Sequence, residues 1–324
     1  MPYRQTTVAD LPAISLYNDT LELIALPSVG ARITHLRRRR RGREWLWHNP
    51  VLPFEVPAPE PDPSPSVYVD RYDSGGWDEC FPTVGACPNP GPVGQPLLPD
   101  HGELWHAWWT HDVYVNAGVT TWRSVTQCRS VPAIFSRLVE VPAGDGDRVT
   151  LSYSVKSTAD QPFPWLWSAH PLFTVQPGTR IELPGIETMK VDGGLGPTPL
   201  SADADVRWPL GGGESYLMPE REGWAAKLFA RSPAEGKALL TDPARGESLE
   251  LAWSGAELPW MGMWLNPGGF GPENERHYTL AIEPCTAAPD RLDRAVNGWK
   301  VAPVLQPGEE RSWRLTVVLR DEAS

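Results

Sequence analysis

Glycine and proline constrain the fold of this chain more than any other feature of its sequence. The 324 residues include 29 glycines and 36 prolines. Together they make up about a fifth of the chain, where average usage gives roughly an eighth. Proline interrupts both α-helices and inner β-strands. Such frequent interruption leaves little room for long helices, and it favours an all-β, turn-rich protein.

Short segments in which apolar and polar residues alternate support that expectation. Residues 21–26 (LELIAL) and 31–36 (ARITHL) predict two strands joined by a turn, and residues 44–47 return after Gly42 as in a hairpin. Strands this short and this frequent are typical of a sandwich or barrel. The pattern favours a helix only at 287–297, which Thr286 could cap. Further strands are expected at 136–141, 148–154, 180–183, 224–229, 248–253 and 312–319.

Two segments have a strongly biased amino-acid composition. Residues 50–65 contain seven prolines. We expect them to form a stiff surface loop within a single domain spanning 1–324, because the residues before them make a poor independent domain. Residues 37–41 are five arginines, which could form a nucleic-acid or phosphate patch. A solvated hairpin tip is the favoured interpretation, because the rest of the chain is acidic.

The overall charge and hydropathy exclude several classes of protein. The net charge is −11 and the pI about 5.2, which argues against a general nucleic-acid binder. No apolar stretch approaches about twenty residues, so no membrane span is expected, and the N-terminal residues lack the pattern of a signal peptide. The cysteines are too few and scattered for a disulfide scaffold, which predicts reduced thiols in a cytoplasmic protein. They are Cys80, Cys87, Cys128 and Cys285.

Four stretches place histidines or carboxylates beside turns and large aromatic rings: 74–87, 98–109, 165–173 and 280–286. Aromatic rings stack on the apolar faces of sugars, while carboxylates and imidazoles bind hydroxyl groups. Glu283 follows the strand-like LAI, where partial desolvation would make a carboxylate a better base. His170 has a similar extended setting before Pro171. On the sequence alone, a surface glutamate is about as good an interpretation of Glu283 as a base. A core histidine with satisfied hydrogen bonds is about as good an interpretation of His170 as a functional group.

The sequence gives little support for a metal site or a nucleotide site. His101, His106 and His111 are spaced too widely to share one face of a helix or strand, and the spacing of Cys80 and Cys87 does not suit a zinc knuckle. The sequence lacks GxGxxG, the P-loop, GxSxG and HExxH. We therefore expect no metal and no cofactor.

In order along the chain, these stretches resemble the aldose 1-epimerase (galactose mutarotase) superfamily. The resemblance rests on GARITHL, GGWDECFP with TVG, LPDHGELW, SAHPLF, IEPCT and LQPGEERSWRLTVVL, and it covers nearly the whole length. It implies a large antiparallel β-supersandwich. It also implies that the protein interconverts the α and β anomers of an aldose without a cofactor.

The resemblance also assigns roles to individual residues. Glu283 matches the catalytic base, His170 the general acid, and His101 the histidine that binds and polarises the sugar. Asp78, in GGWDE, is expected to bind sugar hydroxyls, and Trp77 and Trp264 are candidates for stacking on the sugar. A further substrate-binding carboxylate is expected between residues 203 and 222.

The motif layout is most similar to the hexose-6-phosphate mutarotase branch, with one departure. That branch usually has an arginine three residues after the HG glycine, where this chain has Trp105. Because arginine is the natural bidentate ligand of phosphate, its loss favours an unphosphorylated aldose. The Asn-Arg motif of galactose mutarotases proper is also missing.

Three functions remain open on the sequence. The leading one is an aldose 1-epimerase-like isomerase that takes a small-molecule sugar, as a monomer or homodimer, with neither nucleic acid nor membrane as partner. The alternatives are a non-catalytic carbohydrate-binding protein of the same fold and a hexose-6-phosphate mutarotase. A glycosidase using Glu283 and Asp78 as paired carboxylates is a weaker interpretation.

Overall fold

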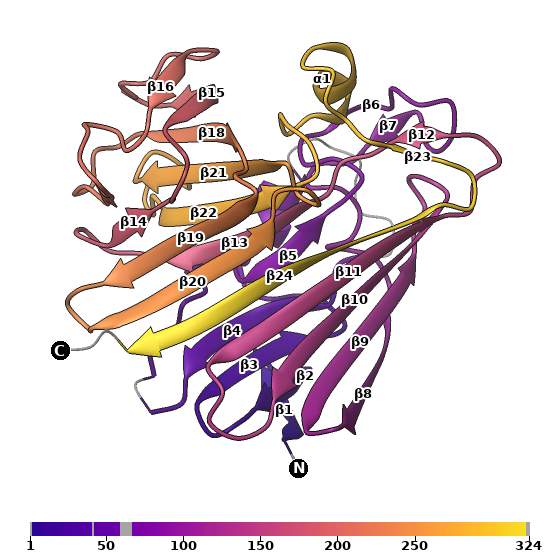
Figure 1. Ribbon diagram of the computed structural model, residues 1–324, viewed down its shortest axis with the longest axis horizontal. Helices are drawn as coiled ribbons and strands as arrows, with labels where there is room; N and C mark the ends of the chain where they lie inside the picture. The colour runs from indigo at the N-terminus through magenta and orange to yellow at the C-terminus, as the bar shows by residue number, and fades with distance from the viewer. Residues whose placement is uncertain (1, 41, 59–66, 322–324) are drawn as a thin grey trace.

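Antiparallel β-sheet makes up nearly all the regular structure of the computed structural model, which describes residues 2–40, 42–58 and 67–321 (Figure 1). The first large sheet has 11 strands and the second has 9. Across the first, the order is β1 (Tyr3–Val8), β2 (Leu11–Tyr17), β3 (Leu21–Leu26), β4 (Arg32–Arg38), β5 (Trp77–Cys80), β13 (Ser168–Thr174), β22 (Tyr278–Cys285), β21 (Trp260–Pro267), β18 (Ala225–Arg231), β15 (Thr188–Leu195) and β16 (Asp205–Arg207). Across the second, it is β17 (Tyr216–Leu217), β14 (Arg180–Glu182), β19 (Glu235–Asp242), β20 (Glu247–Ser254), β24 (Glu310–Asp321), β11 (Arg148–Ser157), β10 (Ala133–Pro142), β9 (Val119–Gln127) and β8 (Thr110–Asn116).

The remaining elements are short. Two pairs of two-residue strands lie outside the large sheets: β12 (Phe163–Pro164) with β23 (Val304–Leu305), and β6 (Cys87–Pro88) with β7 (Leu97–Leu98). Residues Tyr68–Tyr72 form a single π-helical turn, and α1 (Leu292–Asn297) is a six-residue helix. In the described part of the chain, no helix is long and apolar enough to cross a membrane. All four cysteines are free and buried.

The all-β prediction is confirmed, and so is a strand at each of the alternating segments outside 44–47. Residues 44–47 form isolated bridges, including Arg37 with Glu44, and no continuous strand. The helix begins at Leu292, later than predicted. The reason is that Thr286 does not cap it: its hydroxyl accepts a hydrogen bond from the Trp167 amide at 2.8 Å.

The arginine run lies partly at a hairpin turn, as expected, but it is tied to the protein more than a solvated tip would be. Arg37 pairs with Glu22 at 2.7 Å, and Arg38 with Asp321 at 3.1 Å. Arg39 and Arg40 occupy the turn, and residue 41 lies outside the described residues. Of the proline-rich segment, 50–58 has no regular strand or helix, and residues 59–65 lie outside the described part.

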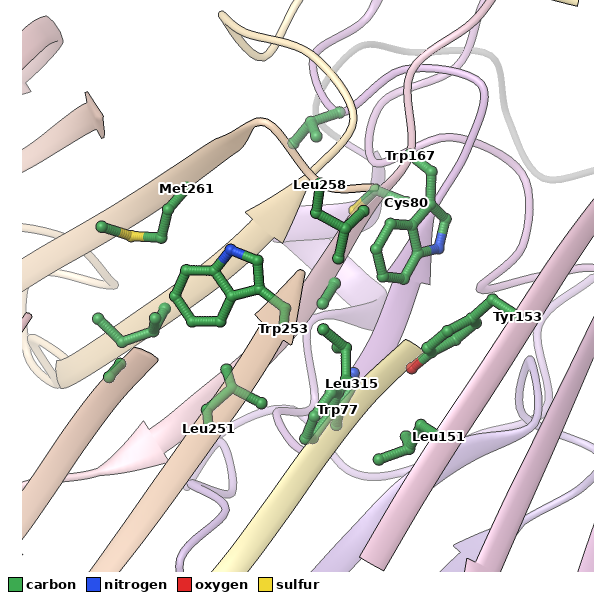
Figure 2. Close-up of a cluster of buried hydrophobic side chains, with 14 of the residues drawn as sticks. Trp77, Cys80, Leu151, Tyr153, Trp167, Leu251, Trp253, Leu258, Met261 and Leu315 are labelled. Carbon is green, nitrogen blue, oxygen red and sulfur yellow. The ribbon is translucent and has the colours of Figure 1, made fainter. Parts of the chain in front are cut away.

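The hydrophobic core lies between the two large sheets. One buried cluster contains side chains from both, including Trp77 of β5, Leu151 of β11, Leu251 of β20 and Leu315 of β24 (Figure 2). Strand β10 alternates buried and half-buried residues along its length, so only one of its faces is covered. By contrast, every residue of β22 is buried. The inner strands of the first sheet are therefore covered on both faces.

A charged network crosses this core. Arg137 of β10 pairs with Glu79 of β5 at 3.1 Å, and the Tyr153 hydroxyl donates to the same Glu79 oxygen at 3.0 Å. Arg137 also donates to the Ala31 carbonyl. Both members of the ion pair are fully buried. Removing one partner of such a pair strands the other charge away from water, which is strongly destabilising.

We expect Arg137→Met to lower the free energy of unfolding by about 3–5 kcal/mol. Arg123→Met is the matched control, because Arg123 is half-exposed and its partner Asp112 lies 3.9 Å away. Such a surface pair contributes at most about 1 kcal/mol. Urea denaturation of both variants measures the difference. Equal stability of the two variants would show that the buried pair does not hold the sheets together.

Candidate active site

The candidate site is a cavity of about 220 Å³ beside the inner strands of the first sheet. Strands β13, β22, β21 and β18 lie side by side there and contribute His170, Glu283, Trp264 and Lys227. Loops supply the remaining walls, including His101 after β7. Sites for drug-sized ligands usually measure about 300–1,000 Å³. This cavity therefore suits a ligand of about the size of a single sugar ring.

His170 is held by a buried carboxylate on the neighbouring strand. Asp78 of β5 lies opposite His170 in the strand register, and its Oδ1 is 2.8 Å from His170 Nδ1. Asp78 Oδ2 accepts hydrogen bonds from Arg32 and from the Tyr68 hydroxyl, each at 2.7 Å. Burial raises the pKa of Asp78, but Arg32 and His170 lower it more, so it lies well below its usual value. An ionised Asp78 fixes a proton on Nδ1 and leaves Nε2 as the nitrogen that can exchange a proton with a ligand.

Two residues expected to bind substrate do not line the cavity. Both oxygens of Asp78 are engaged by protein groups and the residue is buried, so the structure does not place Asp78 among the residues that line the cavity. Its position instead orients His170. Trp77 precedes it on β5, and alternation along the strand turns this side chain to the opposite face. There Trp77 is buried in the core (Figure 2), so it cannot stack on a sugar.

His101 lies against the same network. Its ring stacks on Tyr68 with centroids 4.0 Å apart, and the ring of His170 is 4.9 Å away. Burial lowers the pKa of His101, but the carboxylate of Asp100, 3.0 Å from Nδ1, and that of Asp78 raise it, so the net shift is upward. His101 can therefore donate a hydrogen bond to a sugar oxygen.

The backbone conformation explains why glycine follows His101 in the HG motif. His101 and Gly102 both adopt positive φ, at 56° and 66°. A Cβ atom at residue 102 would lie 2.3 Å from the Phe81 carbonyl oxygen, so only glycine fits there. The turn holds His101 beside the cavity.

Glu283 lies on β22, the strand that pairs with β13. It is 1% exposed, and one of its oxygens, Oε2, binds the Lys227 ammonium. Its other oxygen has no hydrogen-bond partner among the described residues. Gly262, opposite on β21, provides the space, since a Cβ atom there would come within 2.9 Å of Oε2. One carboxylate oxygen is thus fixed, and the other remains for a ligand.

Lys227 is shared with a second carboxylate, because its Nζ also lies 3.1 Å from Asp290 Oδ1. Burial lowers the pKa of Lys227, but Asp290 and Glu283 raise it well above its usual value. Burial raises the pKa of Asp290, Lys227 opposes the rise and Glu283 adds to it, so that it lies at about 6. Both Lys227 and Asp290 line the cavity.

The sequence did not reveal these two residues. Lys227 is a lone charge within the apolar run of β18, a signal that could have been recognised. Asp290 follows Glu283 by a short irregular segment and matches no motif. No described residue between 203 and 222 lines the cavity, so the extra carboxylate expected there stays a prediction: the acidic residues that line the cavity are Asp73, Asp100, Glu283 and Asp290.

Several sequence predictions now have a defined geometry. Glu283, His170, His101 and Trp264 line one cavity. Trp105, at the position of the branch's arginine, is fully buried against Tyr68 and Tyr72. Among the described residues that line the cavity, Lys227 is the sole lysine or arginine. Its charge is already matched by two carboxylates.

Comparison with known proteins gives a consistent result. The family model described as aldose 1-epimerase matches residues 12–317. No curated protein matches the chain. Many solved structures do, and because identities are below one fifth, the likeness concerns the fold.

Three of these structures illustrate the match. A Klebsiella pneumoniae protein, provisionally described as an aldose 1-epimerase, has a TM-score of 0.74 and 16% identity, covering 99% of this chain and 83% of its own. A galactose mutarotase-like protein from Lactobacillus casei has a TM-score of 0.65 and 18% identity, with 95% and 100% covered. Another from Clostridium acetobutylicum has a TM-score of 0.64 and 14% identity, with 98% of each chain covered.

Proposed function

Because the chain belongs to the aldose 1-epimerase family, we propose that it interconverts the α and β anomers of an unphosphorylated aldose. The observation that carries the proposal is the convergence of Glu283 and His170 on one cavity the size of a sugar ring. One oxygen of Glu283 has no partner among the residues that the structure describes, and His170 is oriented by Asp78. General acid–base catalysis requires both groups within reach of the same bond.

In this mechanism Glu283 is the base, His170 the acid and His101 a hydrogen-bond donor to the sugar. Glu283 takes the proton of the C1 hydroxyl while His170 protonates the ring oxygen, and the C1–O5 bond breaks to give the open-chain aldehyde. After rotation about C1–C2, the O5 hydroxyl attacks the other face of the carbonyl. His170 then recovers its proton from O5, and Glu283 returns its proton to the carbonyl oxygen. Two protons move in each direction and no oxidation state changes.

Lys227 supports this cycle through its ion pair with Glu283. Its ammonium holds Glu283 Oε2 in an ion pair, and Asp290 keeps the lysine charge balanced when Glu283 becomes neutral. Trp264, half-buried at the cavity wall, offers an aromatic face for the sugar ring. We further propose a cytoplasmic location, which the four free cysteines support.

Saturation-transfer NMR tests the proposal directly, because it measures exchange between α and β anomeric protons at equilibrium. A panel of unphosphorylated aldoses, including glucose, galactose, mannose and xylose, should contain at least one whose exchange the protein accelerates. Binding of a sugar without accelerated exchange would instead support a non-catalytic carbohydrate-binding protein.

A 6-phosphate should give no advantage. The described cavity wall contains no arginine, and Lys227, its one lysine, is held by Glu283 and Asp290. We expect kcat/KM for glucose 6-phosphate to be no higher than for glucose, measured by the same NMR exchange. A preference of tenfold or more for the phosphate would contradict the assignment to unphosphorylated sugars. It would then require a cation from outside the described cavity wall, for example Arg71, which pairs with Glu55 on the surface, or an arginine of the 37–43 run.

A further inference from the structure

Strands β1 to β4, at one edge of the first sheet, carry a group of charged side chains that the proposed mechanism does not use (Figure 1). The strand register places Arg4 of β1 opposite Ser15 of β2. On β2, β3 and β4, Tyr17, Glu22 and Arg37 lie opposite one another. Opposite residues share a face of the sheet, and so do residues two apart on one strand. All five side chains therefore lie on the same face.

A cavity of about 280 Å³ lies among these side chains. Its lining residues are three arginines, one carboxylate, one tyrosine and one glycine: Arg4, Arg37, Arg39, Glu22, Tyr17 and Gly42. Three arginines against one glutamate leave a local net charge of +2, in a chain whose overall net charge is −11. The cavity shares no lining residue with the candidate active site, so it is a separate feature of the molecule.

Glu22 holds two of the arginines in place. It is buried, and its Oε1 accepts hydrogen bonds from Ser15 Oγ at 2.7 Å and from Arg4 Nη2 at 3.0 Å. Its Oε2 accepts two from Arg37, at 2.7 and 3.1 Å. Burial raises the pKa of Glu22, but Ser15 and Arg37 lower it more, so it lies below its usual value. Both oxygens of the ionised carboxylate are therefore engaged by protein donors.

Arg39 approaches the cavity from the turn after β4. Its Nη1 donates to the Asn18 carbonyl at 2.8 Å, and its guanidinium lies 5.1 Å from the centre of the Tyr17 ring. The guanidinium of Arg4 lies 5.6 Å from the centre of the same ring. Hydrogen bonds within the described residues use one N–H group of Arg4 and one of Arg39. Because a guanidinium carries several N–H donors, both arginines have donors left for a ligand.

We propose that this cavity binds a small phosphate-bearing anion. Guanidinium groups bind phosphate oxygens through pairs of hydrogen bonds, and they are weakly hydrated, so arginine is well suited to hold such an anion. An anion with two or more charges would neutralise the local excess of positive charge. Free phosphates and the phosphate groups of small esters share this chemistry. The inference does not depend on the proposed function, because the cavity is separate from the candidate active site.

A nucleic acid fits these observations less well. Its backbone carries many phosphates, and it would approach a chain whose net charge is −11. The cavity of about 280 Å³ also limits the ligand to a small group. A small anion needs only the local positive charge that the three arginines supply.

Isothermal titration calorimetry at low ionic strength tests the proposal, with inorganic pyrophosphate, glycerol 3-phosphate and a DNA duplex as probes. The proteins are the wild type, Arg4→Gln and Arg39→Gln. Both arginines are exposed, so these variants should fold. Arg207→Gln is the matched control, because Arg207 is an exposed arginine on β16 that does not line the cavity.

We expect the wild type and Arg207→Gln to bind at least one of the two small anions with equal affinity. Arg4→Gln and Arg39→Gln should each bind it about tenfold or more weakly, as expected when a hydrogen bond between charged groups is lost. Tighter binding of pyrophosphate would identify a free phosphate as the ligand, and tighter binding of glycerol 3-phosphate would identify an ester. The inference would be overturned if neither anion binds, if the duplex binds more tightly, or if Arg4→Gln and Arg39→Gln behave like Arg207→Gln.

The melting temperature gives an independent readout, because a ligand that binds only the folded state raises it. Pyrophosphate should raise the melting temperature of the wild type and of Arg207→Gln relative to potassium chloride at the same ionic strength. The rise should be lost in the double variant Arg4→Gln/Arg39→Gln. An equal rise in all three proteins would show that pyrophosphate acts elsewhere and would contradict the proposal.

Discussion

Replacing Glu283 with glutamine is expected to lower kcat by about 10²–10⁴-fold, the usual contribution of a positioned base, with little change in KM. Glutamine keeps the shape of the side chain but removes the basicity of Glu283, whose Oε1 has no hydrogen-bond partner in the described part of the chain. The variant should fold, because Lys227 keeps its ion pair with Asp290. NMR exchange rates across a range of concentrations of the preferred aldose measure kcat and KM separately.

Asp290→Asn is the matched control for this prediction. Asp290 binds the same lysine and lines the same cavity, and its pKa of about 6 would also suit a base. We expect it to lose at least tenfold less kcat than Glu283→Gln, because the mechanism gives Asp290 no proton to carry. If Asp290→Asn is the more damaging change, or if Glu283→Gln turns over at the wild-type rate, the assignment of Glu283 as base is wrong.

His170→Asn should lower kcat by a similar factor of about 10²–10⁴. The double variant with Glu283→Gln should lose less than the product of the two single losses, because acid and base act together on one bond. Fully multiplicative losses would mean that the two groups act independently. The same NMR assay measures all three variants.

Asp78→Asn tests how His170 is oriented. Asparagine cannot hold a proton on Nδ1 as a carboxylate does, and a comparable change in a catalytic triad costs about 10⁴-fold. Tyr68→Phe is the control, since it removes another hydrogen bond to Asp78, the one at 2.7 Å, without altering the contact at His170. We expect it to cost less than tenfold. Equal losses in Asp78→Asn and Tyr68→Phe would indicate a structural rather than an orienting role for Asp78.

Several of the strands that the sequence predicted have one covered face and therefore alternate. Strand β11, with buried residues at every second position from Val149, is an example. Strand β21 was missed because it is buried on nearly all sides and its sequence WMGMWLNP does not alternate. Such a run has no period from which a strand can be recognised. Most strands that carry the candidate site are, like β21, buried along nearly their whole length.

The same limit explains which site residues were found. Glu283, His170 and His101 were recognisable because each lies in a short motif. Trp77 and Asp78 do not line the cavity, because the motif does not show which way successive side chains of a strand face. The contact between Lys227 and Glu283 spans 56 residues. It arises from the order β18, β21 and β22 in the sheet, which depends on long-range pairing.

The burial of β13 and β22 on both faces determines under which conditions Glu283 and His170 lose their relative positions. Strands in the middle of a sheet, with neighbours hydrogen-bonded on each side, do not fray as edge strands and termini do. Glu283 and His170 therefore keep their relative positions through local fluctuations that open loops and sheet edges. Loss of their geometry on heating accompanies cooperative unfolding of the whole sheet. The relative placement of Glu283 and His170 is therefore expected to last as long as the folded sheet itself.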